Sequence, residues 1–230
     1  MNKHLTEIAY ILDRSGSMQP MQEPAVTAFN EFLKLQLDVP GDARLTLIQF
    51  DDAYEVAVAA RPVQNVDQLT AATYVPRGST ALLDAIGRTI KDIDARLQAL
   101  PEPERPGKVI LAIFTDGEEN ASRTFTAQHI NDLIRLYRDE KGWEFLFLAA
   151  NQDAIATASS MSMDAQMGGN VRFSKVGVMA SGPAMSRKVR AMRMRSSGTM
   201  DTQAMEDEIK SMEALLREEE DKGDKEDKNG

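Results

Sequence analysis

The sequence contains no cysteine and only two histidines, His4 and His129. Without cysteine the chain forms no disulfide, no thiolate zinc site and no cysteine nucleophile, and it fits a reducing compartment. His129 falls in a segment expected to be a surface helix, so a Ser-His-Asp type of catalysis is disfavoured. A functional site in this chain therefore has to be built from oxygen-bearing side chains.

Long apolar runs and a basic surplus are also missing. No run approaches the ~20 apolar residues of a membrane span, and MNKHLTEIAYILD is too interrupted for a secretory signal, so we expect a cytoplasmic protein. The net charge is −9, and residues 203–230, with eleven acidic and five basic side chains, supply six of these charges. The nearly neutral remainder offers no long-range attraction, so nucleic acid is disfavoured as a partner.

What the sequence does contain is an alternation of branched apolar runs with segments of helical period, typical of a parallel α/β sheet. The 230 residues suffice for one such domain and an appendage. Because only residues 51–53 separate the second strand from the third, a crossover helix cannot fit and the third strand should be antiparallel. The expected strands are 8–12, 44–50, 54–60, 108–117, 143–151 and 170–174.

Helical spacing of apolar residues predicts helices between these strands. One begins near Pro24 and ends at Pro40-Gly41, and a short one covers 153–161. Another is expected over 178–194, with a break or a late start at Gly182-Pro183. Two further helices are marked by Leu82, Ile86, Ile90, Ile93 and Leu97, and by Ile130, Leu133 and Tyr137.

The composition shifts after residue 195, so we expect a domain over 1–195 and an acidic appendage over 196–230. The appendage begins with a hinge at 196–199 and continues as a helix over 202–220, with an apolar face formed by Met205, Ile209, Met212 and Leu215. Residues 221–230 contain no apolar side chain and are expected to be disordered.

A basic segment, residues 185–195, carries five cationic side chains interleaved with methionines. It is interpreted as the last helix of the domain, with Met185, Val189 and Met192 against the sheet and its cations in solvent. A partner-binding or anionic-surface helix is a second interpretation. A third is that the acidic appendage folds back onto this segment.

Three short motifs place oxygen-bearing side chains at element ends. The first strand runs into Asp13-Arg14-Ser15-Gly16-Ser17, whose alternate positions can present three oxygen groups on one side. Thr80 opens a helical segment, and Asp116 ends the most apolar strand. A polar loop that caps a helix would explain each motif alone. It does not explain why all three occur in this order at the right edges.

These motifs, DRSGSM, GSTALLDAIG and FTDGEEN, resemble the metal-ion-dependent adhesion site (MIDAS) of von Willebrand factor type A domains, and the resemblance covers roughly residues 4–195. Together with LAANQDAIATASSMSM they are most similar to stand-alone bacterial or phage-type members. The resemblance implies a Rossmann-like, doubly wound, mostly parallel six-stranded sheet of order 3-2-1-4-5-6 with helices on both faces. It also implies that the metal site consists of Asp13, Ser15, Ser17, Thr80 and Asp116.

In such a site Ser15, Ser17 and Thr80 are expected to bind the ion directly, while Asp13 and Asp116 often act through water. Hydroxyls and carboxylates are hard donors that suit Mg²⁺, and Mn²⁺ or Ca²⁺ as alternatives. Mostly neutral direct ligands leave the ion electrophilic toward an Asp or Glu of a partner. In this sheet order the first and fourth strands, which end at Asp13 and Asp116, meet at the switch point where ligands bind.

Four neighbouring residues are candidates for the rim that faces the partner: Arg14, Gly78, Glu118 and Asn120. Arg14 could instead have an exposed structural role, and Glu118, Glu119 and Asn120 could be merely solvated. Asp51 and Asp52 lie on the short link between two strands and are interpreted as turn residues.

The sequence thus predicts a metal-dependent protein–protein interaction module without catalytic residues. Two alternatives stay open: a Mg²⁺-dependent hydrolase or phosphotransferase, and a structural or assembly protein with a vestigial metal site. The three motifs contain no lysine, and the chain has no P-loop and no GxGxxG, which weighs against the enzyme. The identity of the partner and the oligomeric state are not encoded in any recognisable pattern.

Overall fold

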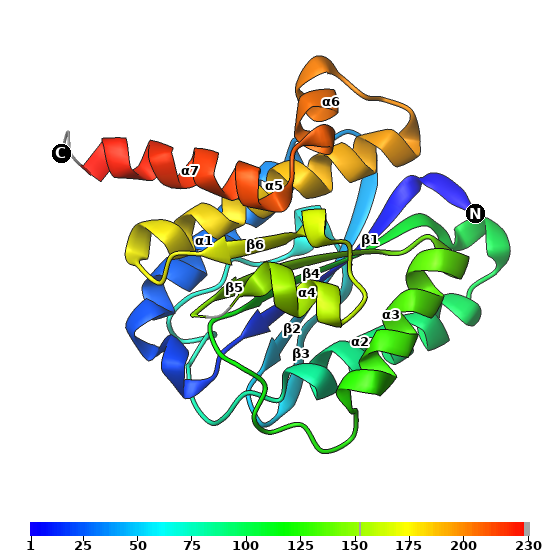
Figure 1. The fold of residues 1–230 in the computed structure, drawn as a ribbon. Coiled ribbons are helices and arrows are strands. Elements are labelled where there is room, and N and C mark those ends of the chain that lie inside the picture. The colour runs from blue at the N-terminus through cyan, green and yellow to red at the C-terminus, as the bar shows by residue number, and fades with distance from the viewer. Residues whose placement is uncertain (152, 228–230) are drawn as a thin grey trace.

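The computed structural model describes residues 1–151 and 153–227 of the chain. One sheet has the order β3-β2-β1-β4-β5-β6, and helices cover both of its faces (Figure 1). β3 pairs with β2 in antiparallel orientation, whereas the other pairings are parallel. The predicted fold class and sheet order are confirmed. The strands are β1 (Asn2–Asp13), β2 (Asp42–Phe50), β3 (Tyr54–Pro62), β4 (Pro106–Thr115), β5 (Glu144–Ala150) and β6 (Gly168–Val171).

The helices lie between and after these strands, close to the predicted positions. Short 3-10 turns span Gly16–Met21, Val63–Asn65, Glu102–Glu104 and Ala165–Met167. Among the described residues, no helix has the length and apolar character needed to cross a membrane. The α-helices are α1 (Gln22–Leu37), α2 (Leu82–Gln98), α3 (Ala127–Lys141), α4 (Ala154–Ser160), α5 (Lys175–Ser197), α6 (Thr202–Ile209) and α7 (Met212–Asp227).

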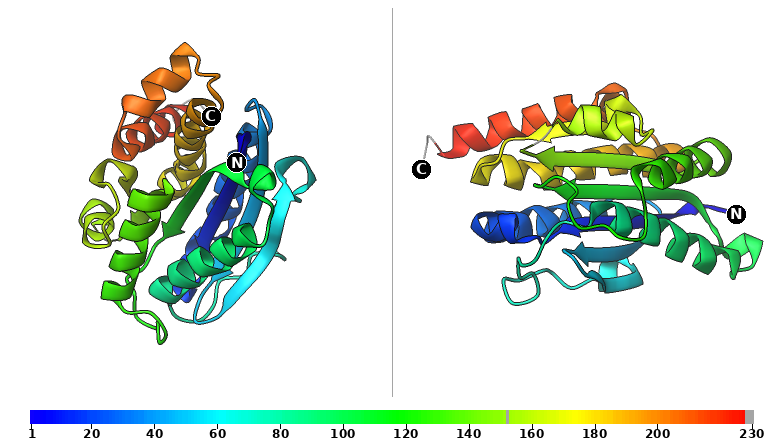
Figure 2. Two further views of the ribbon diagram at one scale, coloured as in Figure 1. Left: turned by 90° about the vertical axis from the view of Figure 1, so that its right-hand side faces the viewer. Right: turned by 60° about the horizontal axis from the view of Figure 1, so that its bottom comes forward.

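Two apolar layers hold the sheet between the helices. Tyr10 and Leu12 of β1 face the layer that contains α1 and α5, whereas Ala9 and Ile11 face the layer that contains α2, α3 and α4. Figures 1 and 2 show α2 and α3 side by side, while α6 and α7 lie over α5. Because a central strand is buried on both faces, its sequence is continuously apolar. Each large buried side chain contributes roughly 2 kcal/mol.

Helix α5 begins at Lys175 and runs unbroken through Gly182-Pro183, so the expected break or late start is wrong. A Cβ at Gly182 would lie 2.0 Å from the carbonyl oxygen of Ala28, which shows that the backbones of α5 and α1 touch there. Proline within a helix costs about 3 kcal/mol. Burial of the α5 face that includes Val178, Met185 and Val189 offsets this cost.

The C-terminal segment differs from the expected single helix with a disordered end. Lys210 and Ser211 separate α6 from α7, so the expected apolar face is divided: Met212 and Leu215 are buried, but Met205 and Ile209 are exposed. Helix α7 continues to Asp227, where disorder was expected from 221. Residues 228–230, for which disorder was also expected, lie outside the described part of the chain.

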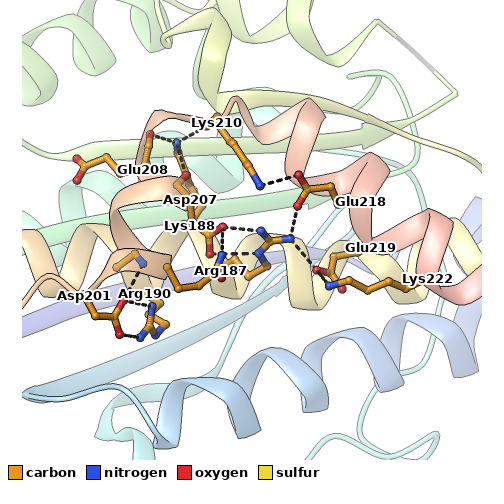
Figure 3. Close-up of polar contacts among 12 residues, drawn as sticks. Arg187, Lys188, Arg190, Asp201, Asp207, Glu208, Lys210, Glu218, Glu219 and Lys222 are labelled. Carbon is orange, nitrogen blue, oxygen red and sulfur yellow. Dashed lines mark hydrogen bonds and ion pairs between the residues drawn. The ribbon is translucent and has the colours of Figure 1, made fainter.

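The basic segment 185–195 is where the C-terminal helices attach. Met185, Val189 and Met192 are buried against the sheet, as predicted. The cations were expected in solvent, but all of them except Arg193 bind the acidic appendage (Figure 3). Arg193 is buried and donates to the carbonyls of Gln36 and Gly41. Arg187 lies 2.5 Å from Asp207 and 2.8 Å from Glu218. The Lys188 ammonium donates to three carbonyl groups at the end of α6, those of Asp207, Glu208 and Lys210. The interpretation that the appendage folds back onto this segment is therefore confirmed.

Helix α7 also covers the outer edge of β6, which would otherwise present unpaired backbone groups. Glu213 accepts a hydrogen bond from the backbone N–H of Asn170 at 2.5 Å, and Arg217 donates to the Asn170 carbonyl at 2.9 Å. Glu220 accepts from the N–H of Arg172 at 3.2 Å. The side chains of α7 thus satisfy this edge in the way that a further strand would.

The link between β2 and β3 depends on Asp51. Its carboxylate accepts the N–H of Ala53 at 2.6 Å, the turn role that was predicted. It also pairs with Arg14 at 3.0 Å and with Arg77 at 2.9 Å, which the sequence did not indicate. Burial alone would raise the pKa of Asp51, but these hydrogen bonds and cations outweigh it and lower the pKa.

We expect Arg187→Met to destabilise the protein by about 3 kcal/mol, because it leaves the buried carboxylate of Asp207 without its guanidinium partner. The matched variant Arg190→Met removes a more exposed pair with Asp201 and should cost roughly 0.5 kcal/mol. Urea unfolding measures both losses, and hydrogen exchange should show faster opening of 202–227 in Arg187→Met. Equal losses in the two variants would contradict this account of the attachment.

We expect Asp51→Asn to lower the free energy of unfolding by roughly 2 kcal/mol at pH 7. Because the folded-state pKa of Asp51 is lowered, its contribution is present above the unfolded pKa of about 4 and is lost as the pH falls through the folded value. The gap between wild type and variant should therefore narrow on acidification. Denaturant titrations at several pH values test this, with the exposed Asp67→Asn as control; a gap that stays constant would speak against the ion pairs.

Candidate metal centre

Asp13 is a fully buried carboxylate at the end of β1, held from both sides. One oxygen accepts the N–H of Ser15 at 2.6 Å, and the other accepts the hydroxyl of Thr115, which ends the neighbouring strand β4. The backbone carbonyl of Asp13 accepts the hydroxyl of the buried Tyr74. Burial raises the pKa of Asp13 to about 6, although these hydrogen bonds oppose the rise. Asp13 therefore ties together the first strand, the fourth strand and the loop before α2.

Ser15, Ser17 and Asp116 converge beside Asp13. The two serine hydroxyl oxygens are 3.0 Å apart, and the Asp116 Oδ1 lies 2.8 Å from Ser17 Oγ and 3.5 Å from Ser15 Oγ. Ser15 and Asp116 are 1% exposed, whereas Ser17 lies at the surface. The cluster is thus buried at its base and opens to solvent along Ser17.

Thr80 reaches the same cluster from the other side of Gly117. A Cβ at Gly117 would lie 3.2 Å from Thr80 Oγ1 and 3.7 Å from Ser17 Oγ, so both hydroxyls border one small space that only glycine leaves open. Two hydrogen bonds fix Thr80 in place: its N–H donates to the Asn120 side chain at 2.9 Å, and its carbonyl accepts the Asn120 N–H at 3.0 Å.

The donor set fits a hard divalent cation. Asp116 Oδ2 is buried without a hydrogen-bond partner within the described residues, a costly arrangement that a cation or its water would satisfy. Burial raises the pKa of Asp116, while the serine hydroxyls oppose this rise. Among the described residues, no group of three or more His, Cys, Asp or Glu side chains could hold a metal. A metal site here consequently depends on hydroxyls together with carboxylates.

The loops that carry these residues approach one another at Gly78. Gly78 has a φ of +66°, a backbone conformation that other residues rarely adopt, so this position favours glycine. Its carbonyl accepts the N–H of Gly16 at 3.0 Å. Gly78 is exposed beside the cluster, where the rim was expected, and it also holds the first loop against the one that precedes Thr80.

Arg14 does not lie on the rim, and this prediction is wrong. The residue is 5% exposed, and its guanidinium donates to Asp51 at 3.0 Å and to Glu55 at 2.6 Å. The alternative prediction was an exposed structural role. Its structural part is right, but Arg14 is buried and not exposed. Neighbouring side chains in an extended segment point in opposite directions, so the alternation that turns Ser15 toward Asp116 turns Arg14 away.

The residues after Asp116 divide into three roles. Glu118 and Asn120 are exposed beside the cluster, and their contact with a partner stays a prediction. Asn120 also fixes Thr80, as described above. Glu119 accepts the N–H groups of Leu83 and Ser122, at 2.9 and 2.6 Å, and so caps the start of α2, where an acidic side chain is favourable.

The sequence pattern did not indicate Thr115, Tyr74 or Asn151 as site residues. Thr115 carried a usable signal, because it ends the strand beside the one that ends at Asp13. Tyr74 lies in a long irregular segment between residues 65 and 82, where no apolar periodicity predicts which way a side chain points. Asn151, with a φ of 57°, donates to the Asp116 carbonyl at 3.3 Å, a contact that depends on the end of β5.

Comparisons with known proteins bear on the fold. No protein-family model and no curated protein matches the sequence. Solved structures do match. Proximal thread matrix protein 1 from the mussel byssus, solved with a zinc-occupied MIDAS motif, has a TM-score of 0.53 at 16% identity, over 82% of this chain and 46% of that chain. A von Willebrand factor type A protein from Catenulispora acidiphila has a TM-score of 0.52 at 13% identity, over 84% and 42%.

The pilus adhesin SpaC from Lactobacillus rhamnosus GG has a TM-score of 0.59 at 14% identity, over 81% of this chain and 31% of that chain. This chain thus spans less than half the length of each of the three proteins. At such low identity the likeness concerns the architecture alone. The sheet order, the antiparallel β3 and these matches together show that the chain has the von Willebrand factor type A fold.

Proposed function

We propose that this chain is a metal-dependent protein-binding module. A divalent cation, Mg²⁺ or alternatively Mn²⁺ or Ca²⁺, binds at Ser15, Ser17 and Thr80, with Asp13 and Asp116 as further members of the site. The cation coordinates an Asp or Glu side chain that a partner protein presents. The chain itself supplies no catalytic residue in this proposal.

The convergence of side chains from three distant segments is the observation that carries the proposal. Ser15 and Ser17 follow β1, Thr80 precedes α2, and Asp116 follows β4. The serines and Asp116 lie within hydrogen-bonding distance of one another, and Thr80 borders the same small space. Loops that merely capped helices would not need to bring these oxygens together.

The character of the donors favours binding of a partner carboxylate. Three of the five side chains are neutral hydroxyls, so a bound cation would retain most of its charge. The exposed Ser17 marks the direction from which a partner can approach. Two structurally similar proteins support this proposal: one has a zinc-occupied MIDAS motif, and the other is a pilus adhesin.

Binding of the cation is tested by Thr80→Val, which has nearly the shape of threonine but lacks the hydroxyl. We expect roughly 100-fold weaker Mg²⁺ or Mn²⁺ binding, because loss of a direct ligand should cost at least as much as the loss of an outer-shell group, which costs about 10- to 100-fold. Thr80→Ser keeps the hydroxyl and should retain most of the affinity. Isothermal titration calorimetry measures both variants, and equal heats for wild type and Thr80→Val would favour a vestigial site.

Binding of a partner is tested by affinity purification with the full chain as bait, with Mg²⁺ or with EDTA. We expect partners that are retained in Mg²⁺, lost in EDTA and lost with Asp116→Ala, because each change removes the bridging cation. The control is Asp67→Ala, which removes an exposed carboxylate from the loop after β3. A partner set that is unchanged by EDTA would contradict the proposed mode of binding.

A further inference from the structure

A trough runs from the candidate metal centre along α2. Its first depression, about 480 Å³, lies between the loop before α2 and the loop after Asp116, with Ser79 and Asn120 among its walls. The second, about 550 Å³, shares Asp52 and Asp84 with the first. The third, about 390 Å³, shares Lys91, Thr124 and Phe125 with the second. The three depressions therefore follow one another along α2, each adjacent to the next.

The trough starts beside the candidate metal centre. Asn120, in the wall of the first depression, is the residue whose side chain and backbone hold Thr80. The carboxylate of Asp84 accepts the N–H groups of Arg123, Thr124 and Phe125, at 2.8 to 2.9 Å. Burial alone would raise the pKa of Asp84, but these hydrogen bonds to its carboxylate outweigh burial and lower the pKa. Asp84 thus has a structural role, because it fixes the backbone of residues 123–125 along one side of the trough.

The middle of the trough combines aromatic rings with cations. The guanidinium of Arg88 lies 4.3 Å from the ring centre of Tyr54, and the ammonium of Lys91 lies 4.9 Å from that of Phe125. Arg88 is 3.6 Å from Asp92. Lys91 is exposed and, within the part of the chain that the structure describes, forms no ion pair. Its charge is therefore available to a carboxylate from outside.

The far end of the trough is apolar. Leu133 and Leu136 of α3 line it together with Phe125. The ring of Phe125 lies against the backbone of α2 because residue 87 is glycine, where a Cβ would be 2.5 Å from the ring. Leu136 is 41% exposed, so the isolated chain leaves this apolar surface in water.

We infer that the trough binds an extended segment of the partner, next to the acidic residue that the metal coordinates. This segment carries a second carboxylate for Lys91 and an aliphatic or aromatic side chain for the surface at Leu136. The inference rests on the proposed function. Its further support is that the first depression adjoins Asn120, which holds Thr80, and that Lys91, without an ion pair among the described residues, lies beside the apolar end.

A random-peptide library displayed on phage and panned on the full chain in Mg²⁺ tests the inference. We expect selected peptides to share one acidic residue and, at a constant spacing, a second acidic residue and an apolar one. Fluorescence anisotropy then gives the affinity of a selected peptide. Lys91→Glu and Leu136→Ser should each weaken binding about tenfold. The matched controls Lys34→Glu and Leu35→Ser, on exposed positions of α1 across the sheet, should leave it unchanged.

The outcomes separate this inference from the proposed function. Peptides that need Mg²⁺ and Thr80 but tolerate Lys91→Glu and Leu136→Ser would overturn the trough and leave the metal bridge intact. Peptides that bind the trough equally well in EDTA or with Thr80→Val would overturn the bridge, and the inference with it. If panning yields no Mg²⁺-dependent peptide, the extended segment is the wrong occupant, whatever partner the affinity purification finds.

Discussion

The parallel pairing of β1 with β4 is the constraint on which the candidate site depends. The chain leaves these two neighbouring strands toward opposite faces of the sheet, so their following loops diverge and leave a crevice between them. The buried carboxylate of Asp13 bridges this point, because it accepts hydrogen bonds from Ser15 in its own loop and from Thr115 on β4. Asp116 is one residue further, and the serines meet it there. Any slip in the β1–β4 register would separate these groups.

Much of this arrangement could be predicted from the sequence, because its signals are local. An apolar run that leads to an acidic residue marks the C-terminal parts of both β1 and β4, and a link of three residues requires β3 to be antiparallel. The alternation of side chains placed Ser15 and Ser17 together. The same alternation, applied strictly, would have placed Arg14 on the opposite side, where it pairs with Asp51.

The parts that could not be predicted depend on contacts between distant segments. Helix α5 tolerates Pro183 because it packs on α1 at Gly182, and neither fact can be inferred from residues 175–197 alone. Helix α7, with few apolar residues, looks unstable in isolation. It is held by ion pairs to Arg187 and Arg172 and by hydrogen bonds to the edge of β6. Tyr74 reaches Asp13 from a loop without periodicity. The charge and composition of a segment can be read from its sequence. The packing of α5, the attachment of α7 and the hydrogen bond of Tyr74 depend instead on contacts with residues far away in the chain.

The way in which the site is anchored bears on what it can do. Several groups that fix the loops are not proposed to bind a ligand: Tyr74 and Asp51 hold backbone or arginine, whereas Asp116 Oδ2 has no partner within the described residues. Asp13 has both roles, because it fixes the loops and belongs to the proposed metal site. Loops already fixed in this way lose little conformational freedom when a ligand binds. The guanidinium of Arg14 is turned away from the hydroxyls, and the carboxylates of Asp51 and Glu55 neutralise its charge. A cation at those hydroxyls would therefore face neutral donors and one free carboxylate oxygen, an environment that leaves it able to attract a partner's carboxylate.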